Sequence, residues 1–272
     1  MFGTMKLFYV LCIPVFFAAC QQSGNEQKTP VVTDSLSVAI DNMRKDLAIK
    51  PSDAATRIFL ANALIEQGNY AAADSQAAFL EKYPATLPNA FYIYGLSSLN
   101  RKDTATAITH LTKAIGLRKD SSEYEAVMLT GDLLLDKKEY NKALELYTLA
   151  SRIDSTSAEA SYAAAEVYNL QGKETQARQQ YVQTLALDPA YSPAYIGLGN
   201  LLSKYGKWKE ALPHYNMAAK ADPTNADAFY LRGRALLTLG NQPAGIDDLT
   251  KALSFRKNFP EARQLLDSVK NQ

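Results

Sequence analysis

Two histidines are the residues of this sequence best suited to acid–base or metal chemistry, and they lie far apart. His110 and His214 are the only histidines in 272 residues. A metal site of the usual spacing places cysteines, histidines or paired carboxylates beside each other, and neither histidine has such companions in its surrounding sequence. We therefore expect each histidine either to pack at a turn or to lie on an exposed face.

The other groups that could support catalysis or bind a cofactor are equally scattered. The two cysteines, Cys12 and Cys20, both lie at the extreme N-terminus, so no disulfide framework can staple the rest of the chain. No glycine-rich run that could cradle a phosphate occurs. The sequence thus predicts a protein that is not an enzyme, with no cofactor, no metal and no small-molecule substrate.

Charge is nearly balanced, with 29 Lys and Arg against 28 Asp and Glu. Proteins that bind nucleic acid normally carry a basic face that neutralises phosphates. A nucleic-acid partner is therefore not expected.

The N-terminal segment has the pattern of a secretory signal. Lys6 precedes an apolar run from Leu7 to Ala19, which has the length of a signal h-region and is shorter than the ~20 residues that span a bilayer. Met5, directly before the lysine, is an alternative start to Met1.

This run ends in Phe17-Ala18-Ala19-Cys20, which resembles the lipobox of bacterial lipoproteins, with Phe17 where leucine is commoner. The resemblance implies removal of residues 1–19, acylation of Cys20 and stable anchoring in the cell envelope. Gln21, where an aspartate would signal inner-membrane retention in enterobacteria, favours an outer-membrane lipoprotein on either face of that membrane. An ordinary signal peptide cleaved nearby and a cytosolic chain with an apolar start remain alternatives.

Residues 20–34 are mostly polar, have no helical pattern and are expected to form a flexible tether.

After residue 34 the sequence has a period of 34 residues. The triplets Ala158-Glu159-Ala160, Ser192-Pro193-Ala194 and Ala226-Asp227-Ala228 recur at that spacing. Each triplet is followed by an apolar pattern typical of an amphipathic helix.

Residues 192–225 carry the features of one known repeat. They contain Tyr195, Leu198-Gly199, Ala211, Tyr215 and Asp222-Pro223, in the order and spacing of the tetratricopeptide repeat. The chain therefore resembles the tetratricopeptide repeat family. That resemblance implies an all-α, right-handed superhelical solenoid of helix-turn-helix units.

Positions that recur in successive repeats, here called columns, support this assignment. The first-helix column is small: Ala61, Gly95, Gly131, Ala165, Gly199 and Gly233. The second-helix column is also small: Ala73, Ala107, Ala143, Ala177, Ala211 and Gly245. Bulky residues run beside it: Leu111, Tyr147, Tyr181, Tyr215 and Leu249. Since two helices approach closely only where their crossing point lacks bulk, we expect these columns to mark the crossing of each pair.

Six repeats are predicted over residues 54–259, beginning at 54, 88, 124, 158, 192 and 226. The second is two residues longer, in a turn around Lys119 to Glu123. Residues 35–53 are expected to form an N-terminal capping helix and residues 260–272 a C-terminal one, because the ends of a solenoid need a cover.

In the family, the first helices line a concave groove that holds a peptide or a partner helix. The resemblance by column gives these candidate groove residues: Asn62, Tyr92, Leu96, Met128, Asp132, Tyr162, Glu166, Ile196, Asn200, Tyr230 and Arg234. Tyrosine combines large contact area with a polar tip, a composition favoured at interfaces. Packing between neighbouring repeats is the alternative role of the apolar members.

Acidic residues concentrate in the groove of the third and fourth repeats: Glu125, Asp132, Asp136, Glu159 and Glu166. They predict a partner segment rich in Lys or Arg, with a solvated charged face as the alternative. The lysine of the family's carboxylate-clamp members is replaced by Ile58, Tyr92 and Met128, which disfavours a co-chaperone role.

The sequence therefore predicts a lipid-anchored scaffold that holds a partner protein or peptide. The resemblance to envelope lipoproteins of this repeat type implies partners such as cell-wall enzymes or secretion or motility machinery. The alternative is a structural subunit of an outer-membrane assembly, secretion or uptake complex.

Overall fold

The computed structural model describes residues 35–118 and 124–270, which contain α-helices, one short 3₁₀ turn and no strand. The predicted signal peptide, Cys20, the tether and the longer turn of the second repeat lie outside the described residues. The helices are α1 Ser35–Ile49, α2 Ala54–Glu66, α3 Tyr70–Leu80, α4 Leu87–Asn100, α5 Thr104–Leu117, α6 Tyr124–Asp136, α7 Tyr140–Ile153, α8 Ala158–Leu170, α9 Glu174–Leu187, α10 Ser192–Ser203, α11 Trp208–Ala221, α12 Ala226–Thr238, α13 Gln242–Phe255 and α14 Pro260–Lys270, with the 3₁₀ turn at Pro84–Thr86.

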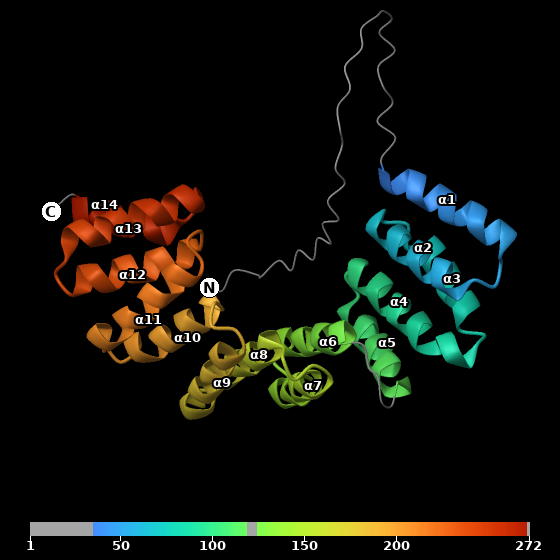
Figure 1. The fold of residues 1–272 in the computed structure, drawn as a ribbon, viewed down its shortest axis with the longest axis horizontal. Coiled ribbons are helices and arrows are strands. Elements are labelled where there is room, and N and C mark those ends of the chain that lie inside the picture. The colour runs from blue at the N-terminus through green and yellow to red at the C-terminus, as the bar shows by residue number, and fades with distance from the viewer. Residues whose placement is uncertain (1–34, 119–123, 271–272) are drawn as a thin grey trace, which may run out of the picture.

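The helices form consecutive pairs, from α2 with α3 to α12 with α13, and the pairs stack in chain order along an open arc (Figure 1). In the middle of the arc, α6 and α8 lie on its inner side and α7 and α9 on its outer side. Helices α1 and α14 lie at the two ends. This arrangement confirms the predicted all-α solenoid.

The two helices of a pair cross at the predicted small residues. A Cβ on Gly131 would lie 2.7 Å from Cε1 of Tyr147, and a Cβ on Gly199 would lie 2.5 Å from Cε1 of Tyr215. Both tyrosine side chains are fully buried. The crossing points therefore have room for a hydrogen atom and for no carbon.

The turns between paired helices use the left-handed backbone region. Gly172 and Gly206 both have φ of +71° there, which glycine adopts without a steric penalty. In the second and third repeats the same place is taken by Lys102 (φ 66°) and Lys138 (φ 60°). The turn is thus kept even where glycine is absent.

The end helices cover apolar surface on one side only. Ile40 and Leu47 of α1 are buried in the core cluster that includes Leu60 and Leu64 of α2. Ala39, which lies 34 residues before Ala73, is exposed, whereas Ala73 is fully buried. Helix α1 therefore packs on α2 as the second helix of a repeat does, with its other face open.

Candidate functional site

The candidate groove residues lie on the first helices of their pairs and differ in accessibility. Asn62 and Asn200 are exposed. The half-buried members are Tyr92, Leu96, Asp132, Tyr162, Glu166, Ile196, Tyr230 and Arg234. Met128 is only 6% exposed, in a core cluster with Val127 and Leu134. Its assignment to the groove is therefore wrong, because the side chain is enclosed between helices.

The side chains at positions 132, 166 and 200, which share one column of the candidate groove, accept hydrogen bonds from buried tyrosines. The hydroxyl of Tyr147 donates to Oδ1 of Asp132 at 2.7 Å. One repeat later Tyr181 donates to Glu166, and in the next repeat Tyr215 donates to Oδ1 of Asn200 at 2.9 Å.

A fully buried tyrosine needs a partner for its hydroxyl. The residues at positions 132, 166 and 200 therefore have a structural role in addition to facing the groove. The sequence analysis missed this role, although in each case the acceptor lies 15 residues before its tyrosine.

Two of these acceptors are carboxyl groups in a poorly solvated position. Burial, with smaller contributions from the nearby Glu159 and Asp136, raises the pKa of Asp132 to about 6, and the hydrogen bond from Tyr147 opposes this rise. Burial likewise raises the pKa of Glu166, opposed by hydrogen bonds from Tyr181 and Tyr162. A cation close to either carboxylate would stabilise its charged form.

Asp132→Asn is expected to make the stability of the protein less dependent on pH. The folded-state pKa of Asp132 lies above its unfolded value, so the folded state loses stability as pH rises through about 4 to 6, when the buried group ionises. Asparagine stays neutral and keeps the Oδ1 acceptor, as Asn200 does.

The variant should therefore exceed the wild type in unfolding free energy by about 3 kcal/mol at pH 7.5. The two should converge near pH 4. Urea unfolding at several pH values measures the difference, and a gap that does not change with pH would contradict the assignment.

The groove tyrosines contribute to contacts between neighbouring repeats. The ring centroid of Tyr162 lies 5.1 Å from that of Tyr191, and the ring of Tyr230 lies 4.9 Å from that of Phe259. In both cases the partner residue comes just before the first helix of the following pair or of α14. These half-buried tyrosines thus join neighbouring repeats, the alternative role that the sequence left open for them.

A hollow of about 520 Å³ lies where the groove runs over the last two pairs. It is lined by Asn200, Ser203, Lys204, Trp208, Arg234 and Thr238, from α10, the turn after it, α11 and α12. It brings together two of the predicted groove residues, Asn200 and Arg234. The sequence did not point to Trp208 or Lys204 as part of this surface.

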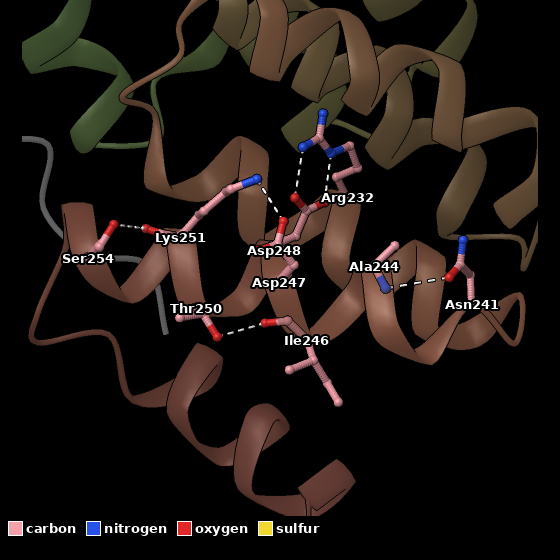
Figure 2. Close-up of polar contacts among 9 residues, drawn as sticks. All are labelled: Arg232, Asn241, Ala244, Ile246, Asp247, Asp248, Thr250, Lys251 and Ser254. Atoms are coloured by element: carbon pink, nitrogen blue, oxygen red, sulfur yellow. Dashed lines mark hydrogen bonds and ion pairs between the residues drawn. The ribbon is translucent and has the colours of Figure 1, made fainter.

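Arg232, two residues before Arg234 in the sequence, instead forms an ion pair within the fold. Its Nε lies 2.6 Å from Oδ2 of Asp248 and its Nη2 lies 2.7 Å from Oδ1. Figure 2 shows this two-pronged contact between α12 and α13. The Asp248 side chain is only 4% exposed, so the pair is largely removed from water.

The histidines take no part in a cluster of catalytic or metal-binding groups. The ring of His110 stacks on Phe91 at 5.9 Å between centroids. His214 is half-buried, and burial lowers its pKa. Across residues 35–118 and 124–270, no group of three His, Cys, Asp or Glu side chains could hold a metal ion. Within the same ranges, no helix has the length and apolar character of a bilayer-crossing segment.

The fold and the columns define a solenoid of helical repeats, and comparison with known families agrees on its type. A tetratricopeptide repeat family matches residues 95–158, and a second, described as TPR repeat, matches residues 199–240. These two stretches are thus similar to tetratricopeptide repeats, and the all-helical fold agrees with that type.

Relatives share the repeats over part of the chain. Human tetratricopeptide repeat protein 6 is 29% identical over 120 residues, which cover 43% of this chain and 23% of that protein. The tetratricopeptide repeat and J domain-containing co-chaperone DNJ1 of Fusarium oxysporum is 34% identical over 100 residues, covering 35% of this chain and 19% of that protein. The chain thus spans less than a quarter of the length of these relatives.

Solved structures match more of the fold at low identity. The C-terminal part of a TPR repeat-containing protein from Cytophaga hutchinsonii superposes with a TM-score of 0.63 at 16% identity, covering 84% of this chain and 93% of that one. Pseudomonas aeruginosa pilF gives a TM-score of 0.61 at 18% identity, covering 84% and 99%. At this identity the likeness concerns the fold alone.

Proposed function

We propose that this protein is a non-catalytic scaffold that holds a partner protein or peptide along the inner face of its repeats, anchored to the bacterial cell envelope through Cys20. Tetratricopeptide repeats generally mediate contacts between proteins, which supports the general class. The observation that carries the proposal is the pair of columns on the first helices, one mostly polar and one mostly aromatic or apolar, whose side chains are exposed at Asn62 and Asn200 and half-buried at most other places.

The partner segment is proposed to be basic where it crosses α6 and α8. Asp132 and Glu166 are held in place by tyrosine hydroxyls, and Glu125 and Asp136 are exposed on the same helix as Asp132. Carboxylates fixed in a partly desolvated groove favour a Lys or Arg side chain more than mobile surface carboxylates do.

Asp132→Asn together with Glu166→Gln is expected to weaken binding of the partner at low salt by about tenfold or more. Both changes keep an oxygen acceptor for the tyrosine and remove only the charge. The affinity of the partner captured from solubilised envelopes can be measured by biolayer interferometry at several salt concentrations. Glu145→Gln, on an exposed face of α7, is the matched control. Equal affinity of the double variant and the control would refute a basic segment.

Cys20→Ala is expected to release the protein from the membrane, because the thiol that would carry the acyl chains is absent. Metabolic labelling with a palmitate analogue should mark the wild type and leave the variant unlabelled. Label on the variant, or a variant that still sediments with membranes, would count against this anchor.

A second candidate is a structural subunit of an outer-membrane assembly, secretion or uptake complex. An apolar hollow of about 500 Å³ at α9, α10 and α11 favours it, lined in part by Val182, Leu201 and Leu202. Val182 is 54% exposed there. If substitutions in this apolar surface abolish assembly and substitutions in the groove do not, the structural-subunit function is supported.

A further inference from the structure

We infer that the hollow over the last two helix pairs receives a carboxylate side chain of the partner segment, held by the guanidinium of Arg234. This inference rests on the proposed groove function and adds the chemistry of the partner at that end of the groove. The basic part of the partner would lie over α6 and α8, and an acidic residue would lie over α10 and α12.

Arg234 is a half-buried cation that forms no ion pair with another of the described residues. Its Nε is buried and has no hydrogen-bond partner within the described residues. The guanidinium lies over the ring of Trp208, 5.0 Å from its centroid, and 5.9 Å from that of Tyr230. Arg232, two residues earlier, shows what such a group forms when an acid is in reach, since it binds Asp248 with two hydrogen bonds (Figure 2).

Two acidic residues on elements that adjoin the hollow are already paired. Glu174 accepts from Nζ of Lys204 at 2.7 Å and from the hydroxyl of Tyr205 at 2.6 Å. Asp227, on the same helix as Arg234, is held by both terminal nitrogens of Arg256. Neither of these two carboxylates is therefore available to Arg234, which leaves room for one from a partner.

The lining of the hollow presents donors to its space. Asn200 uses its Oδ1 to accept from Tyr215 at 2.9 Å, which leaves its amide nitrogen to donate. Lys204 and Arg234 carry only donors, and the lining contains no carboxylate. A guanidinium and a carboxylate fit each other through two parallel hydrogen bonds. The charge of Arg234 and the donors around it fit an acidic side chain.

The third and fourth repeats have the opposite charge in the same column, and the fifth has the neutral Asn200. Asp132 and Glu166 occupy the places on α6 and α8 that Arg234 occupies on α12. The groove is thus acidic in its middle and basic toward its C-terminal end. A partner segment with charges of both signs would be bound in one direction only.

The test is selection of a displayed library of random peptides, about 12 residues long, on the full chain in detergent. Three proteins are compared: the wild type, Arg234→Gln, and Asp132→Asn with Glu166→Gln. Thermal melting confirms that each remains folded. Peptides selected by the wild type should combine Lys or Arg with an Asp or Glu on one side of them. Arg234→Gln should lose the preference for the acid and keep the preference for the base.

Substitution of the selected acid by its amide gives the quantitative measure. It should weaken binding to the wild type by about 10- to 100-fold and leave binding to Arg234→Gln nearly unchanged. Peptides that bind the groove with no acidic preference, or an amide peptide that binds the wild type equally well, would overturn the inference and leave the groove function standing. Selected peptides that bind equally to all three proteins would overturn both.

Discussion

Replacement of Asp248 by alanine is expected to lower the free energy of unfolding by about 3–5 kcal/mol, since it leaves a partly buried guanidinium without its counter-ion. Arg232 has a side-chain exposure of 21% and Asp248 one of 4%. The ion pair joins α12 to α13 (Figure 2). Its loss should therefore open the last pair first, and with it the packing of α14.

Asp247→Ala is the matched control for this prediction. Asp247 is the preceding residue and also forms an ion pair, with Lys251, but its side chain is 62% exposed. Exposed pairs contribute little to stability, so urea unfolding of this variant should follow the wild type closely. An equal loss of unfolding free energy in both variants would show that the buried ion pair contributes no more to stability than the exposed one. Asp248→Ala combined with Arg232→Met should recover part of the loss, because no charge is then left unpaired.

Gly199→Leu is expected to cost about 3 kcal/mol or more, the upper part of the range for an overpacked core. The first added carbon already lies 2.5 Å from the Tyr215 ring. That ring is fully buried, and its hydroxyl is fixed by Asn200. It can move away only by breaking this bond. Helices α10 and α11 must separate, which disturbs the stacking of both neighbouring pairs.

Gly116→Ala provides the contrasting substitution. Gly116 lies within α5, is exposed, and has no atom within 4 Å of an added Cβ. Alanine should therefore stabilise the helix by about 0.5–1 kcal/mol. Thermal unfolding of the two variants should shift in opposite directions. A Gly199→Leu protein that melts with the wild type would place the helix crossing elsewhere and refute the repeat register.

The sequence was sufficient to predict the repeats because their spacing and their small columns follow directly from helix geometry. The clearest examples of such a helix crossing are the close contacts of Gly131 with Tyr147 and of Gly199 with Tyr215. The tight approach of Gly197 to Tyr181 of the preceding repeat was missed. That contact joins two repeats, and their relative placement is not encoded in the period of one helix.

The columns of the sequence also could not predict the polar contacts in the groove. A column places Asp132, Glu166 and Asn200 on one face of their helices and does not show how far a tyrosine hydroxyl reaches across to them. Met128 shares its column with Tyr162, yet it is buried while Tyr162 is half-buried. A flexible apolar side chain can fold into the gap between helices, whereas the hydroxyl of a tyrosine needs a polar neighbour.

The most direct test of the central claim compares two glutamates of one repeat. Glu125 on α6 and Glu145 on α7 are both exposed, the first on the proposed binding side and the second on the other helix of the pair. A photo-crosslinking residue would replace each in turn in cells. We predict that position 125 captures a defined partner, that position 145 does not, and that Asp132→Asn with Glu166→Gln abolishes the capture. Capture from position 145 alone would contradict binding in the groove.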